Sequence, residues 1–345
     1  MTPDDLRSQP LWAITSYFNP VGYRSRLANY QTFRQRLAVP LATVELCYRG
    51  AFQLQPGDAE ILIQIQGQDV MWQKERLLNR ALAALPASCE AVAWLDCDVV
   101  FDTPDWPQRA CEKLGQVPII QPFAEFVDLA HSTALADAST GPLAAKGQSL
   151  ARLVSGGSSA ADLIALPGAA RMRGFSMGLA WAARRDLLDK HGLYDACILG
   201  GGDRAVASPA YGNLDVVQRL FSLNPAELRH FLEWAEPFHE SVRGEVSYIE
   251  GGVCHLWHGE MSDRRYASRR EGMLEYRFDP YHDIAIAPNG CWHWNSDKPQ
   301  MHEYMANYFK LRKEDGETCQ SDAACQKASH VRGPRTLPIA NDRSR

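Results

Sequence analysis

Two carboxylates, Asp96 and Asp98, flank a single cysteine directly after the apolar run Ala91–Leu95. The run is typical of a buried strand in a parallel sheet, and ligands of open α/β sheets bind just beyond the carboxyl ends of such strands. Two hard oxygen ligands at this point suit a divalent cation that keeps free positions for phosphate oxygens. The competing interpretation is a turn in which Asp98 only caps the next segment.

A second group of candidate ligands is the histidine pair His255 and His258, three residues apart. On a helix or in a tight turn, side chains at this spacing can face one ion, and neutral imidazole is a common ligand of Mn and Zn. A mixed carboxylate and imidazole site favours a transition metal, with Mn²⁺ expected where phosphates also bind. The alternative is that one histidine packs against Trp257 and the other is solvated.

Charged residues that suit phosphate capture lie in three further segments. Arginine binds phosphate oxygens in a planar, bidentate way, although an exposed helix face explains the same residues equally well. Gly200–Gly202 would let the backbone approach a ligand closely and leave the next carboxylate, Asp203, exposed. The basic residues concerned are Arg24, Arg26, Lys74, Arg264, Arg265, Arg269 and Arg270.

The elements that must position these groups alternate between strands and helices. Such alternation predicts an α/β fold with a mostly parallel sheet and helices on both faces. Residue periodicity and helix-breaking residues set the expected bounds. We expect strands at Leu11–Tyr17, Ala42–Cys47, Glu60–Gln66, Ala91–Leu95 and Val117–Gln121, and helices at Tyr23–Leu37, Trp72–Ala84 and Pro107–Leu114.

The second half of the chain is less regular. Ala134–Ala170 is rich in Ala, Ser and Gly, and a mobile insertion that serves as a lid and a plain disordered insert are both open interpretations. Beyond it we expect a strand at Gly174–Ala183 and helices at Arg184–His191, from Asn224 to about Trp234, and at His302–Arg312. The domain prediction is therefore one domain over residues 1–312, with a helical C-terminal part and a polar, flexible tail over residues 313–345.

Composition restricts the class of protein. Hydrophobic residues make up 46% of the chain and charged residues 22%, which is normal for a soluble globular protein. A net charge of −5 argues against sequence-independent nucleic-acid binding, and no apolar run reaches bilayer-spanning length. The N-terminus lacks signal-peptide features. The nine cysteines show no framework spacing, so reduced thiols are favoured over a Cys319–Cys325 pair, and we expect a cytoplasmic protein.

Four blocks in this order resemble GT-A glycosyltransferases, above all family 7, the galactosyl- and N-acetylgalactosaminyltransferases with their chondroitin-polymerase relatives. Leu95–Asp98 resembles the Asp-x-Asp motif, and Trp72–Asn79 resembles the nucleotide-binding helix. Phe175–Asp203 resembles the block that ends in Trp-Gly-Gly-Glu-Asp, with Leu199 in place of its Trp and Arg204 after its acid. Cys254–Gly259 resembles the later histidine segment.

The resemblance implies a GT-A, Rossmann-like fold and a role for individual residues. Asp98 and His258 would ligate Mn²⁺ (or Mg²⁺), His255 would be a second imidazole ligand, and Asp96 would contact the ribose or the metal. Asp203 would be the general base near the acceptor. The donor nucleotide would lie along Tyr17, Asn19, Arg24, Lys74 and Asn79, with Arg264 or Arg269 stabilising the leaving group.

The resulting hypothesis is a metal-dependent glycosyltransferase of polysaccharide biosynthesis type. It would transfer a hexose or N-acetylhexosamine from a UDP-sugar to a saccharide, glycoconjugate or other hydroxyl acceptor, with inversion if Asp203 is the base. One alternative is a metal-dependent phosphoester hydrolase or nucleotidyltransferase that uses the same ligands. Another is a non-catalytic protein that binds nucleotide-sugars or glycans.

Overall fold

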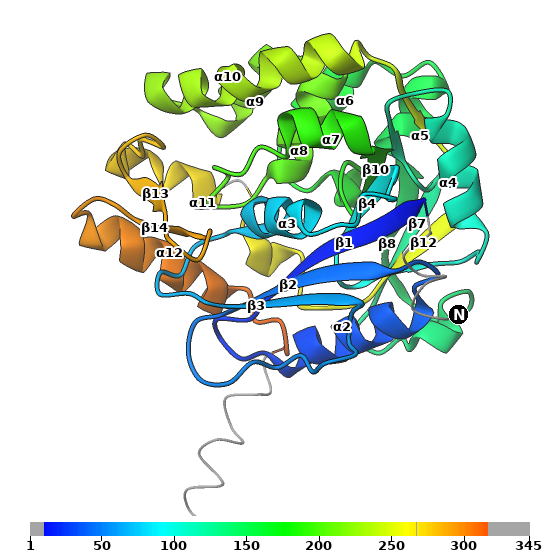
Figure 1. Cartoon of the computed structure of the whole chain (residues 1–345), viewed down its shortest axis with the longest axis horizontal. Coiled ribbons are helices and arrows are strands. Elements are labelled where there is room, and N and C mark those ends of the chain that lie inside the picture. The colour runs from blue at the N-terminus through cyan, green and yellow to red at the C-terminus, as the bar shows by residue number, and fades with distance from the viewer. Residues whose placement is uncertain (1–9, 267, 317–345) are drawn as a thin grey trace, which may run out of the picture.

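A seven-stranded sheet runs through the middle of the molecule in the computed structural model, which describes residues 10–266 and 268–316 (Figure 1). Every neighbouring pair in this sheet is parallel except those made by β10, which runs antiparallel between β4 and β6. The strand order is β11 (Val246–Tyr248), β6 (Ile119–Gln121), β10 (Ala180–Arg184), β4 (Ala91–Leu95), β1 (Leu11–Phe18), β2 (Leu41–Cys47) and β3 (Ile61–Gln66).

Helices cover both faces of this large sheet, which confirms the predicted α/β class (Figure 1). On one face, aromatic side chains of α2 (Arg24–Arg36) and α4 (Trp106–Leu114) are buried in one core. On the other, a larger core joins the apolar faces of α3 (Lys74–Ala83), α7 (Arg185–His191), α8 (Gly202–Ala210), α9 (Leu214–Phe221), α10 (Pro225–Val242) and α12 (Pro299–Leu311).

A second sheet, which the sequence did not predict, lies beside the first. Its strands are short, and two of its four pairings are parallel. The order is β5 (Val99–Phe101), β12 (Gly252–His255), β7 (Glu125–Leu129), β8 (Leu143–Ser149) and β9 (Phe175–Ser176). A separate two-stranded ribbon joins β13 (Ile284–Ile286) to β14 (Trp292–Trp294).

The chain passes between the two sheets at two adjacent points. Asp96–Asp98 connects β4 of the large sheet to β5 of the small one, and Met177–Leu179 connects β9 to β10. The backbone N–H of Asp96 donates to the carbonyl of Leu179 over 2.9 Å, so the two crossovers are bonded to each other. The expected single strand at Gly174–Ala183 is therefore broken, and Leu179 adopts a φ of +76°, which is uncommon outside glycine.

The segment Ala134–Ala170 carries more regular structure than its composition indicates. It contains β8, which pairs with β7 and β9, and two short helices, α5 (Leu150–Ser155) and α6 (Ala160–Ala165). Ser149 and Ser159 cap these helices, each accepting a hydrogen bond from the backbone N–H three residues ahead. Two of the five serines in this segment are thus helix caps.

The start of the expected tail is packed against the domain. Glu314 is almost fully buried, and the carboxylate of Asp315 accepts hydrogen bonds from the backbone N–H groups of Arg24 and Ser25 at 2.9 and 2.8 Å. The rest of the expected tail, with Cys319 and Cys325, lies outside the described residues. The seven cysteines that the structure does describe are free thiols.

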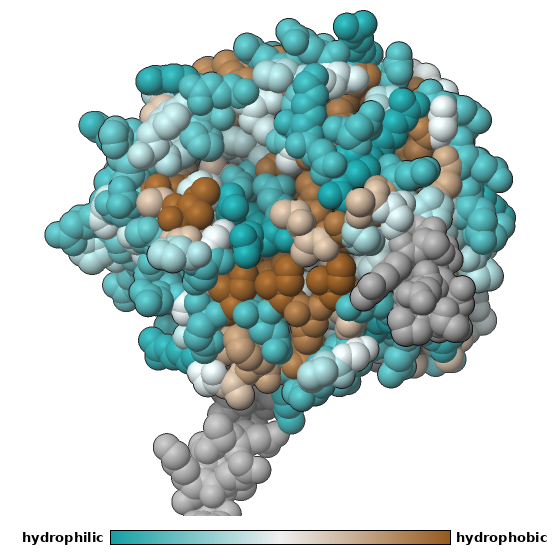
Figure 2. Space-filling view, viewed as in Figure 1, coloured by the Kyte–Doolittle hydropathy of each residue, from teal (hydrophilic) through white to brown (hydrophobic). Residues whose placement is uncertain are grey.

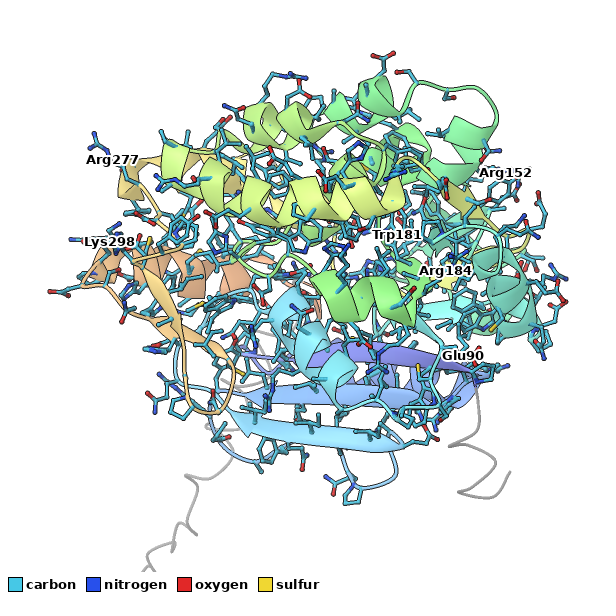
Figure 3. All side chains as sticks on the ribbon, turned by 45° about the horizontal axis from the view of Figure 1, so that its top comes forward. Glu90, Arg152, Trp181, Arg184, Arg277 and Lys298 are labelled. Atoms are coloured by element: carbon cyan, nitrogen blue, oxygen red, sulfur yellow. The ribbon has the colours of Figure 1, made fainter. Side chains whose placement is uncertain are left out.

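The surface facing the viewer in Figure 2 is mostly hydrophilic, with apolar side chains gathered over the region of β2 and β3. Inside, Trp94 of β4 and Trp181 of β10 stack at 6.3 Å between ring centroids, across the antiparallel pair (Trp181 is labelled in Figure 3). Among the helices that the structure describes, none combines the length and the apolar character needed to cross a bilayer.

Helix α10 begins as predicted but ends later. Asn224 accepts hydrogen bonds from the N–H groups of Ala226 and Glu227, while the Glu227 carboxylate accepts one from the Asn224 N–H, forming a capping box. The helix continues past the expected end because Phe238 and Val242 are still buried. Pro237 lies inside it.

Replacing the cap should weaken the fold without touching the cavity described below. We expect Asn224→Ala to lower the free energy of unfolding by about 0.5–2 kcal/mol, because two N–H groups lose their acceptor. Asn224→Ser, which keeps a capping oxygen, should lose less. Urea unfolding followed by circular dichroism measures both. If both variants lost the same free energy of unfolding, helix capping would not explain how Asn224 stabilises the fold.

Candidate functional site

Most of the candidate residues converge on one cavity of about 380 Å³, a volume typical of small-molecule sites. It opens beyond the carboxyl ends of β1 and β4, where Thr15, Ser16 and Asp96 line it. Its wall is strongly basic for a chain of net charge −5, with seven arginines and one lysine against four acids. The basic residues are Arg26, Lys74, Arg171, Arg204, Arg264, Arg269, Arg270 and Arg312.

Strand register brings the histidine segment to the acidic motif. In the small sheet, His255 at the end of β12 lies opposite Val99 of β5 and beside Asp128 of β7. The N–H of Leu256 donates to the carbonyl of Asp98 over 2.9 Å, which continues this pairing to the motif itself. Residues more than 150 positions apart therefore meet at the point where the chain changes sheets.

Asp98, His255 and His258 offer ligand atoms that lie within 4.8 Å of one another. Nε2 of His258 is 3.1 Å from Oδ2 of Asp98 and 3.0 Å from Nε2 of His255, and Nε2 of His255 is 3.5 Å from Oδ1 of Asp98. That Oδ1 is buried and accepts no hydrogen bond. Two imidazoles and a carboxylate with an unused buried lone pair form a donor set that fits a divalent transition metal.

Neighbouring charges set the protonation of these ligands. Although burial opposes it, His258 and His255 hold the pKa of the Asp98 carboxyl far below its usual range. Burial and the Arg264 guanidinium lower the pKa of His258 to about 3. Burial and Arg171 oppose the charge on His255, yet Asp98 and Asp128 raise its pKa above the ordinary value. Asp98 is thus ionised and His258 neutral at pH 7, as metal ligands must be, whereas a cation would have to replace the proton that Asp98 and Asp128 favour on His255.

A second carboxylate orients His255. Oδ1 of Asp128 is 3.0 Å from Nδ1 of His255, which leaves Nε2 of the ring directed at Asp98. The same oxygen accepts a hydrogen bond from Arg171 over 3.1 Å. Hydrogen bonding of the outer ring nitrogen to a carboxylate is the usual arrangement around metal-binding histidines. Nothing in the local sequence of Asp128 or Arg171 indicated this role.

Both histidines are buried, at 5% and 7% exposure, so the interpretation of one packed and one solvated histidine is wrong. Trp257 packs against His131 instead, with ring centroids 4.2 Å apart. Arg264 lies next to His258, its Nη2 2.7 Å from Nδ1 of the ring. Arg264 and Arg269 are themselves buried, which excludes the exposed helix face for these two arginines.

Lys74 links the acidic motif to the acid after the glycines. Its Nζ lies 2.5 Å from Oδ1 of Asp96 and 3.3 Å from Oδ1 of Asp203. Despite burial, these two carboxylates raise the pKa of Lys74 well above its ordinary value. Lys74 is therefore a cavity residue and no solvent-facing helix residue. The carboxylate of Asp96 faces this lysine, and among the described residues the metal-ligand group comprises only Asp98 and the two histidines.

Glycines hold Asp203 at the cavity wall. Gly200 and Gly201 have φ of +78° and +107° and lead into α8, whose first turn carries Asp203. A Cβ on Gly178, in the crossover to β10, would lie 2.3 Å from Oδ2 of Asp203, so only glycine permits this approach. Burial and Asp96 raise the pKa of Asp203 while Lys74 opposes them. With 36% of its side chain exposed, the carboxylate is open to a ligand.

Glu314 neutralises two of the cavity arginines. Its carboxylate oxygens lie 2.5 Å from Nε of Arg26 and 2.5 Å from Nε of Arg312. Although burial opposes it, these arginines hold the pKa of Glu314 well below its ordinary value. Sequence reasoning missed Glu314 because the segment after α12 is polar and has no periodicity.

Tyr266 is a further cavity residue without a sequence signal. Burial opposes ionisation of its phenol, but Arg264, Arg171, Arg269 and Arg312 together lower its pKa to about 7. The guanidinium carbon of Arg269 lies 4.7 Å from the centroid of the Tyr266 ring. The field from these arginines shows that this part of the cavity stabilises negative charge.

Four residues expected along the nucleotide do not line the cavity. Tyr17 is buried on the opposite face of β1 from Phe18, because side chains alternate along a strand, and it donates to Gln53. Asn19 builds a turn by accepting from the N–H groups of Gly22 and Tyr23. Arg24 is exposed at the start of α2, and Asn79 exchanges two hydrogen bonds with the backbone of Leu193.

Other side chains of the same segments take their place on the wall: Thr15, Ser16, Phe18, Arg26 and Trp72. The phase of β1 places Phe18 against Trp72 on the side of the cavity and Tyr17 in the opposite core. An apolar run buried on both faces shows no alternation, so the sequence could not reveal that phase.

Comparisons with known proteins find no matching family model and no matching curated protein. Solved structures do resemble the chain at low identity. S. aureus TarS residues 1–349 align with 94% of this chain and 76% of their own, at 10% identity and a TM-score of 0.39. The mannosyltransferase PcManGT from Pyrobaculum calidifontis, solved with GDP-Man and Mn²⁺, aligns over 93% and 80%, at 11% identity and 0.39.

A third similar structure is mannosyl-3-phosphoglycerate synthase from Rubrobacter xylanophilus. It covers 86% of this chain and 90% of its own, at 12% identity and a TM-score of 0.36. Likenesses this distant are too weak to assign an activity, so we base the proposal below on the residues of the cavity. The resemblance to family 7 stays a prediction, because no family model matches.

The first expected outcome at this site concerns metal binding. Asp98→Asn should weaken Mn²⁺ binding by more than about 100-fold, because changes to outer-shell residues alone cost about 10–100-fold. Asp128→Asn should fall in that smaller range. Titration of free Mn²⁺ by electron paramagnetic resonance measures both, with Asp215→Asn on exposed α9 as control. Wild-type affinity in Asp98→Asn would exclude this metal site.

The second expected outcome at this site concerns the stability of a Glu314 variant. Loss of the Glu314 carboxylate leaves Arg26 and Arg312 buried without their counter-charge. Glu314→Gln should lower the free energy of unfolding by about 3–5 kcal/mol at pH 7. Because the folded pKa of Glu314 is depressed, its contribution is complete above the unfolded value near 4.5 and declines as pH falls below it.

The difference between wild type and Glu314→Gln should therefore shrink in urea unfolding at pH 3. Exposed Glu260→Gln is the matched control and should show no such difference. A destabilisation that stays constant from pH 7 to pH 3 would contradict an electrostatic origin.

Proposed function

We propose that this chain is a metal-dependent GT-A glycosyltransferase that transfers a hexose or N-acetylhexosamine from a UDP-sugar to a hydroxyl acceptor. The observation that carries the proposal is the meeting of two kinds of group in one cavity. The ligand cluster of Asp98, His255 and His258 lies beside the Lys74–Asp203 pair, and arginines surround both.

The ligand cluster suits Mn²⁺, with Mg²⁺ as the alternative, because it mixes imidazole with carboxylate. A cation bound by Asp98, His255 and His258 would supply a Lewis acid for the leaving diphosphate. Arg171 and Arg264 lie directly against the two histidines and would bind the diphosphate oxygens, with Arg269 further along the wall. These arginines favour the charge that develops on the leaving UDP.

Asp203 has the properties of the base. Its carboxylate is open to the cavity, its pKa is raised, and it stands on the first turn of α8. It would accept the proton of the acceptor hydroxyl while the acceptor oxygen bonds to the anomeric carbon and the bond from that carbon to the UDP oxygen breaks. Direct displacement of this kind inverts the anomeric centre. Lys74 would keep Asp96 and Asp203 in place by contacting both.

Incubation with a panel of UDP-sugars and Mn²⁺, followed by UDP measurement, tests the proposal. We expect slow UDP release with the correct donor, loss of release in chelator and recovery on adding Mn²⁺. Asp203→Asn should slow release by about 10²–10⁴-fold, the usual contribution of a positioned base, while UDP still binds. Glu271→Gln, an exposed acid at the same cavity, is the matched control.

The products separate the alternatives. A phosphoester hydrolase or nucleotidyltransferase would form a nucleoside monophosphate or pyrophosphate in place of UDP. A non-catalytic binding protein would bind the UDP-sugar without turnover. Near-normal UDP release by Asp203→Asn would remove Asp203 as the base.

A further inference from the structure

At the end of the cavity lined by α8, α9 and the segment that follows α6, two arginines face the ligand space without an acidic partner among the described residues. Within residues 10–266 and 268–316, no carboxylate lies within ion-pair distance of Arg204 or Arg270. By contrast, Glu314 pairs with Arg26 and Arg312, and Asp128 with Arg171. Arg264 and Arg269 also lack a carboxylate partner among the described residues, but they lie against His258 and Tyr266. Arg204 and Arg270 are therefore the arginines at this end of the cavity whose charge is left for a ligand.

Backbone and aromatic contacts hold these two side chains in place. Arg204 donates to the carbonyl of Leu166, just after α6, over 2.9 Å. Arg270 donates to the carbonyl of Gly200 over 3.0 Å, and its guanidinium carbon lies 3.7 Å above the ring centroid of Phe221. Both guanidinium groups are therefore ordered before any ligand binds. None of these contacts involves the metal-ligand segments.

The nearby acids are already engaged or exposed. Asp203, next to Arg204 in the chain, contacts Lys74, and the carboxylate of Glu227 closes the capping box of α10. Glu271 lines the cavity but is exposed. The two guanidinium groups also repel each other. Together with burial, this repulsion by Arg270 lowers the pKa of Arg204 to about 10. Keeping two like charges in a partly desolvated wall is unfavourable unless an anion binds between them.

We infer that Arg204 and Arg270 bind an oxyanion, a carboxylate or a phosphate, carried by the acceptor substrate. This inference rests on the proposed function, in which Asp203 receives the proton of the acceptor hydroxyl. Arg204 follows Asp203 directly on α8, so an acceptor anchored by its anion would present a hydroxyl to that carboxylate. Arginine suits this role because its planar fork matches the geometry of oxyanions.

Binding of small probes tests the inference without requiring turnover. With Mn²⁺ and UDP at saturation to fill the donor part of the cavity, calorimetry would compare D-glucuronate with D-glucose, and glycerol 2-phosphate with glycerol. We expect at least one anion to bind and its neutral match not to bind. The two anions distinguish a carboxylate from a phosphate acceptor.

Arg204→Gln and Arg270→Gln should each weaken binding of that anion by about 10-fold or more, because a hydrogen-bonded charge is lost. Exposed Arg277→Gln, at the edge of the molecule in Figure 3, should bind as wild type. UDP affinity, measured in the absence of any acceptor, shows whether the two arginines serve the donor, and the inference expects wild-type values because it places both at the acceptor. If Arg270→Gln does not fold, Arg270→Lys replaces it, because lysine keeps the charge but lacks the planar fork of arginine.

The inference would be overturned if neither anion bound better than its neutral match. It would also be overturned if the arginine variants bound the anion as tightly as the wild type. A loss of UDP affinity in the variants would also overturn it, because the arginines would then belong to the donor. Failure of the proposed function looks different: UDP-sugars would not be turned over by the wild type, whatever the anions do.

Discussion

The hydrogen bond that joins two chain crossovers is the constraint on which the site depends. Asp96–Asp98 leaves the large sheet while Met177–Leu179 enters it, and the Asp96 N–H to Leu179 carbonyl bond joins them. On one side this junction presents Asp98 to His255 at the end of β12 and to His258 just after it. On the other it brings Gly178 against Asp203. One backbone junction therefore sets the separation between the ligand cluster and the proposed base.

The second general feature is an uneven balance of charge within the cavity. Arginines whose acids are built into the protein, such as Arg26 with Glu314, stay neutralised whether or not a substrate is present. Arginines without such partners leave positive potential for ligands to satisfy. A buried charge without a partner is unfavourable, so the fold gives up stability in those places and regains it when an anion binds.

Six of the seven strands of the large sheet could be predicted because they are apolar runs between helix and turn signals, as in Ala91–Leu95 before Asp96. The three-residue edge strand β11 was missed because it is too short to show a pattern. Asp96, Asp98, His255 and His258 were expected near one another because they occur in short, dense motifs. Asp98 and the two histidines do cluster, whereas Asp96 faces Lys74, and metal binding by the cluster stays a prediction. The small sheet could not be predicted, because its strands are short and pair residues far apart in the sequence, such as His255 with Asp128.

The cavity wall was harder to predict than its centre. Asp128, Arg171 and Glu314 stand in segments without periodicity, and only the folded chain shows their partners. The resemblance placed Tyr17 along the nucleotide. The phase of β1, however, turns its side chain to the face opposite Phe18 and away from the cavity. Register and strand phase are set by long-range packing, which a local pattern does not encode.

The packing of Glu314 and Asp315 against α2 has a consequence for how the protein matures during synthesis. The bonds from Arg24 and Ser25 to Asp315 join positions about 290 residues apart. A nascent chain can form the first strands early, but it cannot neutralise Arg26 until the segment after α12 has left the ribosome. A chain that lacks this segment therefore leaves two arginines of the cavity without their counter-charge.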